Sequence, residues 1–357
     1  MGALRLFLAF GVFLLHFNEQ VLAPQGMAAP AAWAGNLLGG RAVLLFYVVS
    51  GFLISHVLHA KYPPTAPGTA AFWRARVLRI YPLWWVVLLV CLATAPPGWQ
   101  GGLAPALLFG ADWLVAFAHY PRPHWSLFPP GAEIGWALGA ELTFYALAPW
   151  LLRSPRRVAL ALAGSVLLRG VLLASFAPAE PGFKSWSYLF FPAVLCFFLL
   201  GHLAEALGRR YPPGRGMLLA SLGLVVAGAT QLDASTEVGS PWFHLAALGL
   251  AGALPGVFAA TRHSAVSTWL GRLTYPLYLT HCLVLGLLFT SPAGAWMLRM
   301  ARPFAGSALA SGALVLATLA LALGVAVLAH HALEEPLRRA GARLLRAAPA
   351  WRSGDGG

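Results

Sequence analysis

The chain of 357 residues is 59% hydrophobic and only 10% charged, with a mean hydropathy of +0.72. Soluble globular proteins carry charge on about a quarter of their residues, so this composition excludes a soluble domain and predicts an integral membrane protein. The net charge of +13 comes from arginines clustered between apolar runs. That distribution is typical of topology signals and lipid-headgroup contacts, and it argues against a nucleic-acid partner.

Apolar runs of helix length recur along the chain, separated by short breaks rich in arginine or proline. We expect an all-α, polytopic membrane bundle of about ten spans, because no linker is long enough to separate a second domain. Residues 1–339 then form one membrane domain, and 340–357 a basic, glycine-ended cytoplasmic tail. The expected spans are 4–16, 42–59, one ending near 95, 135–152, 158–176, 187–207, 216–232, 241–261, one opening at 271, and 304–332.

Residues 103–118 decide the predicted topology. If this run crossed the bilayer, Arg153, Arg156 and Arg157 would lie outside. If it stays on the outer side, as a re-entrant or interfacial segment, these arginines and every later basic break lie inside. We predict the second arrangement, with both termini cytoplasmic, because it satisfies the positive-inside rule at each break.

The first apolar run holds Arg5 near its start and His16 eleven positions later. At about 1.5 Å per residue, His16 lies roughly 16 Å further along the axis, near the middle of a hydrocarbon core about 30 Å thick. An ionisable group there is expensive to bury and indicates a functional site. Because imidazole transfers protons near neutral pH, His16 is a candidate general base. The polar residues at the end of this run argue against a cleaved signal peptide.

A basic segment precedes the third span on the predicted cytoplasmic side. Arg74, Arg76 and Arg79, followed by Tyr81, fall within eight residues. Guanidinium groups bind phosphate through paired hydrogen bonds and stay charged, so this segment suits a phosphate-bearing ligand. The alternative is a topology signal that contacts lipid headgroups.

Glu141 lies in the middle of the span 135–152, and that run contains no arginine or lysine. A carboxylate at this depth needs a partner, which makes Glu141 a second functional candidate. The alternative is a structural hydrogen bond to a neighbouring helix.

Four further polar side chains lie within predicted spans. Ser50 is next to Gly51 in the middle of a span. These small residues either let two helices approach closely or contact a ligand, and the sequence supports the two interpretations about equally. Tyr275, Tyr278 and His281 follow at i, i+3 spacing and share one helix face, which predicts a polar ladder into the membrane. The alternative is interfacial anchoring by the tyrosines with a structural histidine.

The three cysteines, Cys91, Cys196 and Cys282, each lie inside an apolar run. None has the neighbours of a metal or redox motif, so we expect packing residues and no metal site.

Together these segments resemble the acyltransferase-3 family of integral membrane acyltransferases, which O-acylate glycans and, in some members, macrolides. The matching pieces are Arg5-x10-His16, residues 46–54, residues 74–82, residues 136–145, residues 274–281 and Glu335-Pro336. Two positions depart from the family's pattern. Ala75 replaces the first of two paired arginines, which leaves open whether Arg74 or Arg76 contacts phosphate, and Ala137 follows Trp136 where serine is usual.

The resemblance implies a membrane acyltransferase domain over 1–339 that uses cytoplasmic acyl-CoA, most often acetyl-CoA. The acceptor would be a hydroxyl of a carbohydrate, a lipid-linked sugar or a macrolide-like alcohol, and the setting a bacterial cytoplasmic (inner) membrane, as in polysaccharide modification. His16 and Glu141 are the expected catalytic pair, Glu141 orienting His16 or the acceptor. The residues expected to contact acyl-CoA are Arg5, Ser50, Arg74, Arg76, Arg79, Tyr81, Tyr278 and His281.

Two alternatives stay open on the sequence alone. Acyl transfer is either direct, which we prefer, or proceeds through an acyl-histidine intermediate with ping-pong kinetics. The same buried groups, His16, Glu141 and His281, also fit a proton relay in a transporter or flippase.

Overall fold

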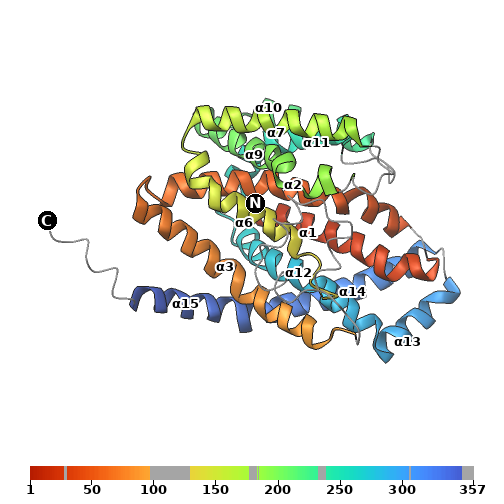
Figure 1. Cartoon of the computed structure of the whole chain (residues 1–357). Coiled ribbons are helices and arrows are strands. Elements are labelled where there is room, and N and C mark those ends of the chain that lie inside the picture. Colours follow the sequence, from red (N-terminus) through yellow and green to blue (C-terminus); the bar gives the residue numbers. More distant parts are fainter. Residues whose placement is uncertain are drawn as a thin grey trace.

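The computed structural model describes residues 1–27, 30–96, 129–176, 183, 185–231, 239–304 and 307–347. All secondary structure in these residues is helical, which confirms the all-α prediction (Figure 1). The re-entrant segment predicted at 103–118 lies outside the described residues. The elements are α1 Gly2–Phe17, η1 Asn18–Leu22, η2 Ala23–Gln25, α2 Pro30–Lys61, α3 Ala66–Ala93, α6 Gly135–Leu151, α7 Pro155–Ser175, η4 Ser185–Leu189, α9 Phe191–Arg210, α10 Arg215–Thr230, α11 Pro241–Thr261, α12 Ala265–Phe289, α13 Pro292–Ala301, η5 Arg302–Phe304, α14 Ala308–Ala329, η6 His330–Glu334 and α15 Glu335–Ala347.

Eight helices in the described part of the chain are long and apolar enough to cross a membrane. They are α1, α2, α3, α7, α9, α11, α12 and α14. Three of these spans, those of α1, α9 and α14, also include the short helices that directly adjoin them. The two remaining predicted spans form α6, with 17 residues, and α10, with 16. Each predicted span therefore coincides with a helix of a polytopic bundle.

The helix boundaries differ from the predictions at three places. Helix α2 already begins at Pro30, in what was expected to be a loop, and α13 is a separate short helix before the last span. Pro336 does not end the last helix: it is the second residue of α15, which follows the π-helical turn η6 without a break. Helix α15 continues to Ala347, across the boundary expected after residue 339.

Serine caps set the start of several helices. Ser154, Ser240 and Ser291 each accept a hydrogen bond from a backbone N–H of the first turn, and each is followed by proline. A capping hydroxyl accepts a hydrogen bond from one of the backbone N–H groups that have no partner within the helix. Proline at the first helical position already has the φ angle that a helix requires. The breaks between the apolar runs thus determine where α7, α11 and α13 begin.

Helix α2 packs against α1 on one side and against α9 on another. The contact with α9 is close because a glycine on each helix faces the backbone of the other. A Cβ at Gly51 would overlap the backbone of Phe198, and a Cβ at Gly201 would overlap the carbonyl oxygen of Val48. Gly51 therefore has the packing role that was one of the two interpretations of this segment.

Stacked aromatic rings hold α6 against α2 and α9. The Phe198 ring lies 4.4 Å, centroid to centroid, from both Tyr47 of α2 and Phe144 of α6. All three side chains are fully buried. Because Phe144 is fixed in this stack, its neighbours on α6 are held toward the face of α2 that carries Ser50.

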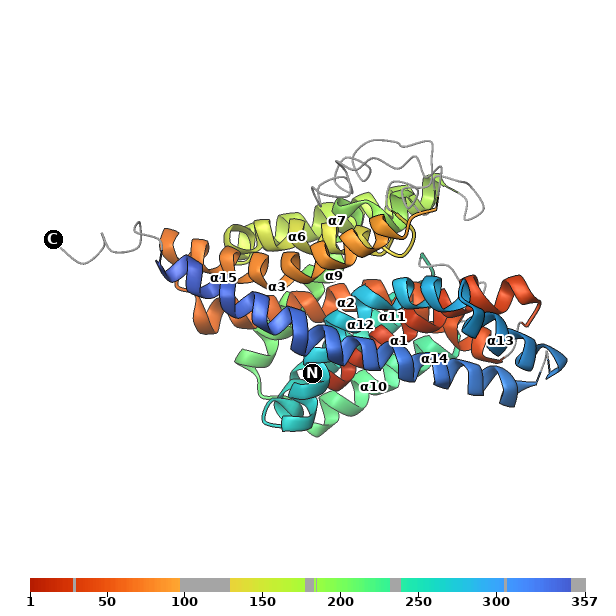
Figure 2. The same cartoon turned by 90° about the horizontal axis from the view of Figure 1, so that it is seen from below.

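Helix α15 lies alongside α3 in both views (Figures 1 and 2). The two helices contact each other where Gly341 meets the side chain of Leu78. Helix α13 lies at the opposite end of the bundle from α15 (Figure 2). The basic segment of α3 and the basic helix α15 therefore share one end of the molecule.

Candidate active site

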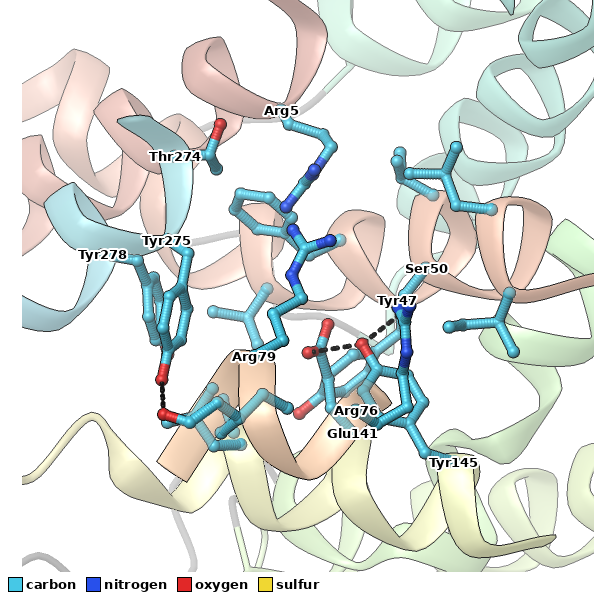
Figure 3. Close-up of a pocket in the computed structure, with 18 residues that line it drawn as sticks. Arg5, Tyr47, Ser50, Arg76, Arg79, Glu141, Tyr145, Thr274, Tyr275 and Tyr278 are labelled. Atoms are coloured by element: carbon cyan, nitrogen blue, oxygen red, sulfur yellow. Dashed lines mark hydrogen bonds between the residues drawn. The ribbon is translucent and has the colours of Figure 1, made fainter. Parts of the chain in front are cut away.

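A cavity of about 100 Å³ lies among five helices, α1, α2, α3, α6 and α12 (Figure 3). Its apolar wall comes mainly from α2. The polar side chains that line it are Arg5, Tyr47, Ser50, Arg76, Arg79, Glu141, Tyr145, Thr274, Tyr275 and Tyr278. Six predicted site residues, drawn from five separate helices, are therefore brought together here.

Three guanidinium groups face this cavity. Arg76 and Arg79 lie one turn apart on α3, and Arg5 reaches in from α1, its side chain pointing toward that of Arg79 (Figure 3). The Nε of Arg76 is buried without a hydrogen-bond partner among the described residues. One carboxylate, Glu141, lines the same cavity. Three positive charges against one negative charge make it a site for an anion.

Three of the residues expected to contact acyl-CoA do not line the cavity, namely Arg74, Tyr81 and His281. Arg74 is exposed, because two positions on a helix separate its direction from that of Arg76 by about 200°. Tyr81 is half-buried, with its ring 5.4 Å from that of Trp85. Of the two arginines left open by the sequence, Arg76 is the one that faces the cavity.

Glu141 is joined to a hydrogen-bond chain within the cavity wall. The Tyr145 hydroxyl donates to Glu141 Oε2 at 2.9 Å and lies 3.2 Å from Ser50 Oγ (Figure 3). Since Tyr145 has only one hydroxyl proton, Ser50 donates to it. Tyr145 was not singled out from the sequence, although its i, i+4 spacing from Glu141 places the two on one face.

The predicted tyrosine ladder of α12 spans the cavity wall. The Tyr275 hydroxyl donates to the carbonyl oxygen of Ile80 at 2.6 Å, and the Tyr278 hydroxyl donates to that of Ile134 at 3.2 Å. Both tyrosines line the cavity. They attach α12 to α3 and to the residue that precedes α6.

His16 and His281 form a pair next to this cavity. His16 Nδ1 lies 2.9 Å from His281 Nε2, and the two rings are stacked with centroids 5.1 Å apart. Neither ring lines the cavity itself. The ring of Tyr278, which does, lies 5.9 Å from that of His281. The structure thus joins His16 to His281, whereas Glu141 contacts Tyr145.

Hydrogen bonds to the backbone fix the proton positions in the neutral histidine pair. His281 Nδ1 lies 2.7 Å from the carbonyl oxygen of Tyr278 and 3.2 Å from that of Leu277. Carbonyl oxygens only accept, so His281 Nδ1 carries the proton and Nε2 accepts from His16 Nδ1–H. The lone pair of His16 is then at Nε2. His281 sets the tautomer in which His16 acts as a base.

Fold and site together define a class: a multi-pass helical membrane protein with a cationic cavity beside a buried histidine pair. The family described as "Acyltransferase domain", acyltransferase-3, matches residues 1–330, and the chain belongs to that family. It is 29% identical to "Acyltransferase MdmB" from Streptomyces mycarofaciens over 373 residues, covering 95% of this chain and 91% of that protein. No solved structure matches the chain. The protein is thus a membrane acyltransferase.

Proposed function

We propose that the protein transfers an acyl group, with acetyl as the first candidate, from cytoplasmic acyl-CoA to a hydroxyl group. The acceptor is a glycan, a lipid-linked sugar or a macrolide-like alcohol, and the setting is a bacterial cytoplasmic membrane with both termini inside. The observation that carries this proposal is the cationic cavity, in which Arg5, Arg76 and Arg79 outnumber the single carboxylate of Glu141. Coenzyme A is the acyl donor whose phosphates such a cavity would bind.

Arg76 and Arg79 are the proposed phosphate contacts, because they lie one turn apart on α3 and line the cavity. Arg5 adds a third charge from α1. The hydrogen-bond chain from Ser50 through Tyr145 keeps the Glu141 carboxylate at the wall. In this arrangement Glu141 offsets part of the repulsion among the guanidiniums before the donor binds.

His16 is the proposed general base. Its Nε2 removes the proton of the acceptor hydroxyl as the oxygen attacks the thioester carbonyl, so a C–O bond forms and the C–S bond breaks. The proton then passes to the departing thiolate of coenzyme A, which leaves as the thiol. His281 acts as a positioning residue, because its Nε2 holds His16 in the required tautomer. The acyl end of the donor reaches His16 past the ring of Tyr278.

The first experiment replaces His16 and measures binding and turnover separately. In purified His16→Ala, we expect acyl transfer to fall by a factor on the order of 10² to 10⁴ while acyl-CoA binding is retained. His263→Ala, a change at an exposed histidine between α11 and α12, is the matched control and should keep full activity. Turnover at the wild-type rate in His16→Ala would refute the role of this residue.

A further inference from the structure

A thiol completes a cluster of three possible metal ligands around the histidine pair. Cys282 Sγ lies 3.4 Å from His281 Nε2, which in turn lies 2.9 Å from His16 Nδ1. All three donor atoms are within 4.8 Å of one another. This cluster departs from the expectation of no metal site, because no sequence motif connects His16 of α1 with His281 and Cys282 of α12.

Two of the three distances between the donors are close to those of a tetrahedral zinc site. With Zn–N about 2.0–2.1 Å and Zn–S about 2.3 Å, tetrahedral geometry places two nitrogens about 3.4 Å apart and a nitrogen and a sulfur about 3.6 Å apart. The observed N–S distance of 3.4 Å is within about 0.2 Å of this value. The two histidine nitrogens would have to move about 0.5 Å further apart, because a zinc ion between them needs more room than a shared proton does.

The surroundings of His281 are those of a metal ligand. Its Nδ1–H donates to the Tyr278 carbonyl oxygen at 2.7 Å, which fixes the ring and directs Nε2 toward the other two donors. Metal-bound histidines are usually oriented by such a bond from their second nitrogen. One thiol and two imidazoles, without a carboxylate, select a borderline or soft ion such as Zn²⁺ over Mg²⁺ or Ca²⁺.

An ion can reach this cluster from the end of α1. His281 and Cys282 are buried, with 0% and 2% of their surface exposed, whereas His16 is partly exposed. The π-helical turn η1, which follows His16, carries the exposed Gln20, whose amide nitrogen lies 3.9 Å from Cys282 Sγ.

We propose that His16, His281 and Cys282 form a Zn²⁺ site whose occupation inhibits the enzyme. Binding requires that Cys282 lose its proton to solvent and that His16 present a lone pair at Nδ1. His16 then carries its proton on Nε2, the atom that the proposed function, on which this inhibition rests, uses as the base. The metal and the acceptor hydroxyl thus require opposite tautomers of one side chain.

Co²⁺ reports on the site without any measurement of turnover. Titrating the purified, metal-free protein with Co²⁺ should produce a thiolate-to-cobalt charge-transfer band and strong tetrahedral d–d bands. Cys282→Ser should abolish the charge-transfer band. Cys196→Ser is the matched control, because that buried cysteine of α9 contacts the carbonyl oxygen of Ala193 and is not in the cluster. Absence of the band in the wild type, or its persistence in Cys282→Ser, would overturn the site.

Inhibition is measured on the same proteins. We expect Zn²⁺ to inhibit acyl transfer by the wild type and by Cys196→Ser, and Cys282→Ser to need at least tenfold more Zn²⁺ for half-inhibition. If Co²⁺ gives the cobalt–thiolate band but Zn²⁺ leaves turnover unchanged, the metal site is upheld and the role of His16 as base is refuted. The two proposals therefore fail separately.

Discussion

Helical geometry separates the arginines of α3 into two groups. Arg76 and Arg79 face the cavity, whereas Arg74 is exposed on another side of the same helix. Residue type alone does not distinguish Arg74, Arg76 and Arg79, since all three are arginines in the basic segment of one span. Their difference lies in direction, and a kinetic experiment can detect it.

We expect Arg76→Ala and Arg79→Ala each to raise the KM for acyl-CoA by about 10-fold or more, since a charge-assisted hydrogen bond contributes about 1.5–3 kcal/mol. Arg74→Ala, on the same helix, should change KM by less than about 2-fold because an exposed charge contributes little. Steady-state kinetics with varied acyl-CoA measure both. Equal KM values in all three variants would refute the donor site.

The positioning role of His281 predicts a graded loss of activity. His281→Ala removes the acceptor for His16 Nδ1–H, so we expect kcat to fall on the order of 10²-fold with little change in the KM for acyl-CoA. His281→Gln places a carbonyl oxygen near the former Nε2 and should recover most of the rate. If the glutamine variant is as inactive as the alanine variant, His281 does not act through the tautomer of His16.

The sequence anticipated the types of residue at the site better than their grouping. His16 and Glu141 were singled out because ionisable groups inside apolar runs are costly. Tyr145, which bonds Glu141 and Ser50, resembles an ordinary aromatic residue of a membrane helix until α6 is placed against α2. Tertiary packing decides which sides of two helices contact each other. The spacing of residues along a single helix does not show this.

The contact between α2 and α9 depends on small residues. Gly51 and Gly201 each face the opposing backbone, so a methyl group at either position would force the helices apart. The serine of the site, Ser50, is next to Gly51 on α2. Separation of the two helices would therefore also move a wall of the cavity.

We expect Gly51→Ala to destabilise the folded protein by about 1–3 kcal/mol, the usual cost of overpacking. The midpoint of thermal unfolding in detergent should fall accordingly. Gly164→Ala in α7 is the matched control, because a Cβ there meets no atom within 4 Å and alanine favours helix. A Gly51→Ala protein with the wild-type midpoint would contradict the close packing.

The apolar runs predicted the spans but not the ends of the helices. Hydropathy marks the part of a helix that crosses the hydrocarbon, whereas caps and neighbouring contacts decide how far the helix extends beyond it. Helix α2 starts at Pro30, before its apolar run, and α15 extends to Ala347 through a strongly basic sequence. Helix α15 is long because it packs on α3, a contact that no local pattern shows.

At the scale of the whole molecule, the proposed reaction requires two sides. In the proposal, acyl-CoA binds from the end of the bundle where α3 and α15 bring their arginines, and the acceptor comes from the other side or from within the membrane. From the positive-inside rule we expect the basic end to be cytoplasmic. Helix α13 lies at the opposite end (Figure 2).

Cysteine labelling tests this orientation. Ala340→Cys in α15 should react with a membrane-impermeant maleimide in inverted vesicles and not in intact cells, because its position is exposed at the basic end. Ala293→Cys in α13 should show the reverse pattern. The native cysteines are buried and give a low background. Labelling of both variants from the same side would refute the proposed topology.

A cryo-EM density map of the protein with a bound, non-reactive acyl-CoA analogue tests the central claim most directly. The account predicts phosphate density against Arg76 and Arg79, and a pantetheine arm that runs through the cavity past Tyr278 to place the acyl carbonyl beside His16 Nε2. Density that leaves the arginines without phosphate, or an imidazole pair with no path to the acyl group, would contradict it.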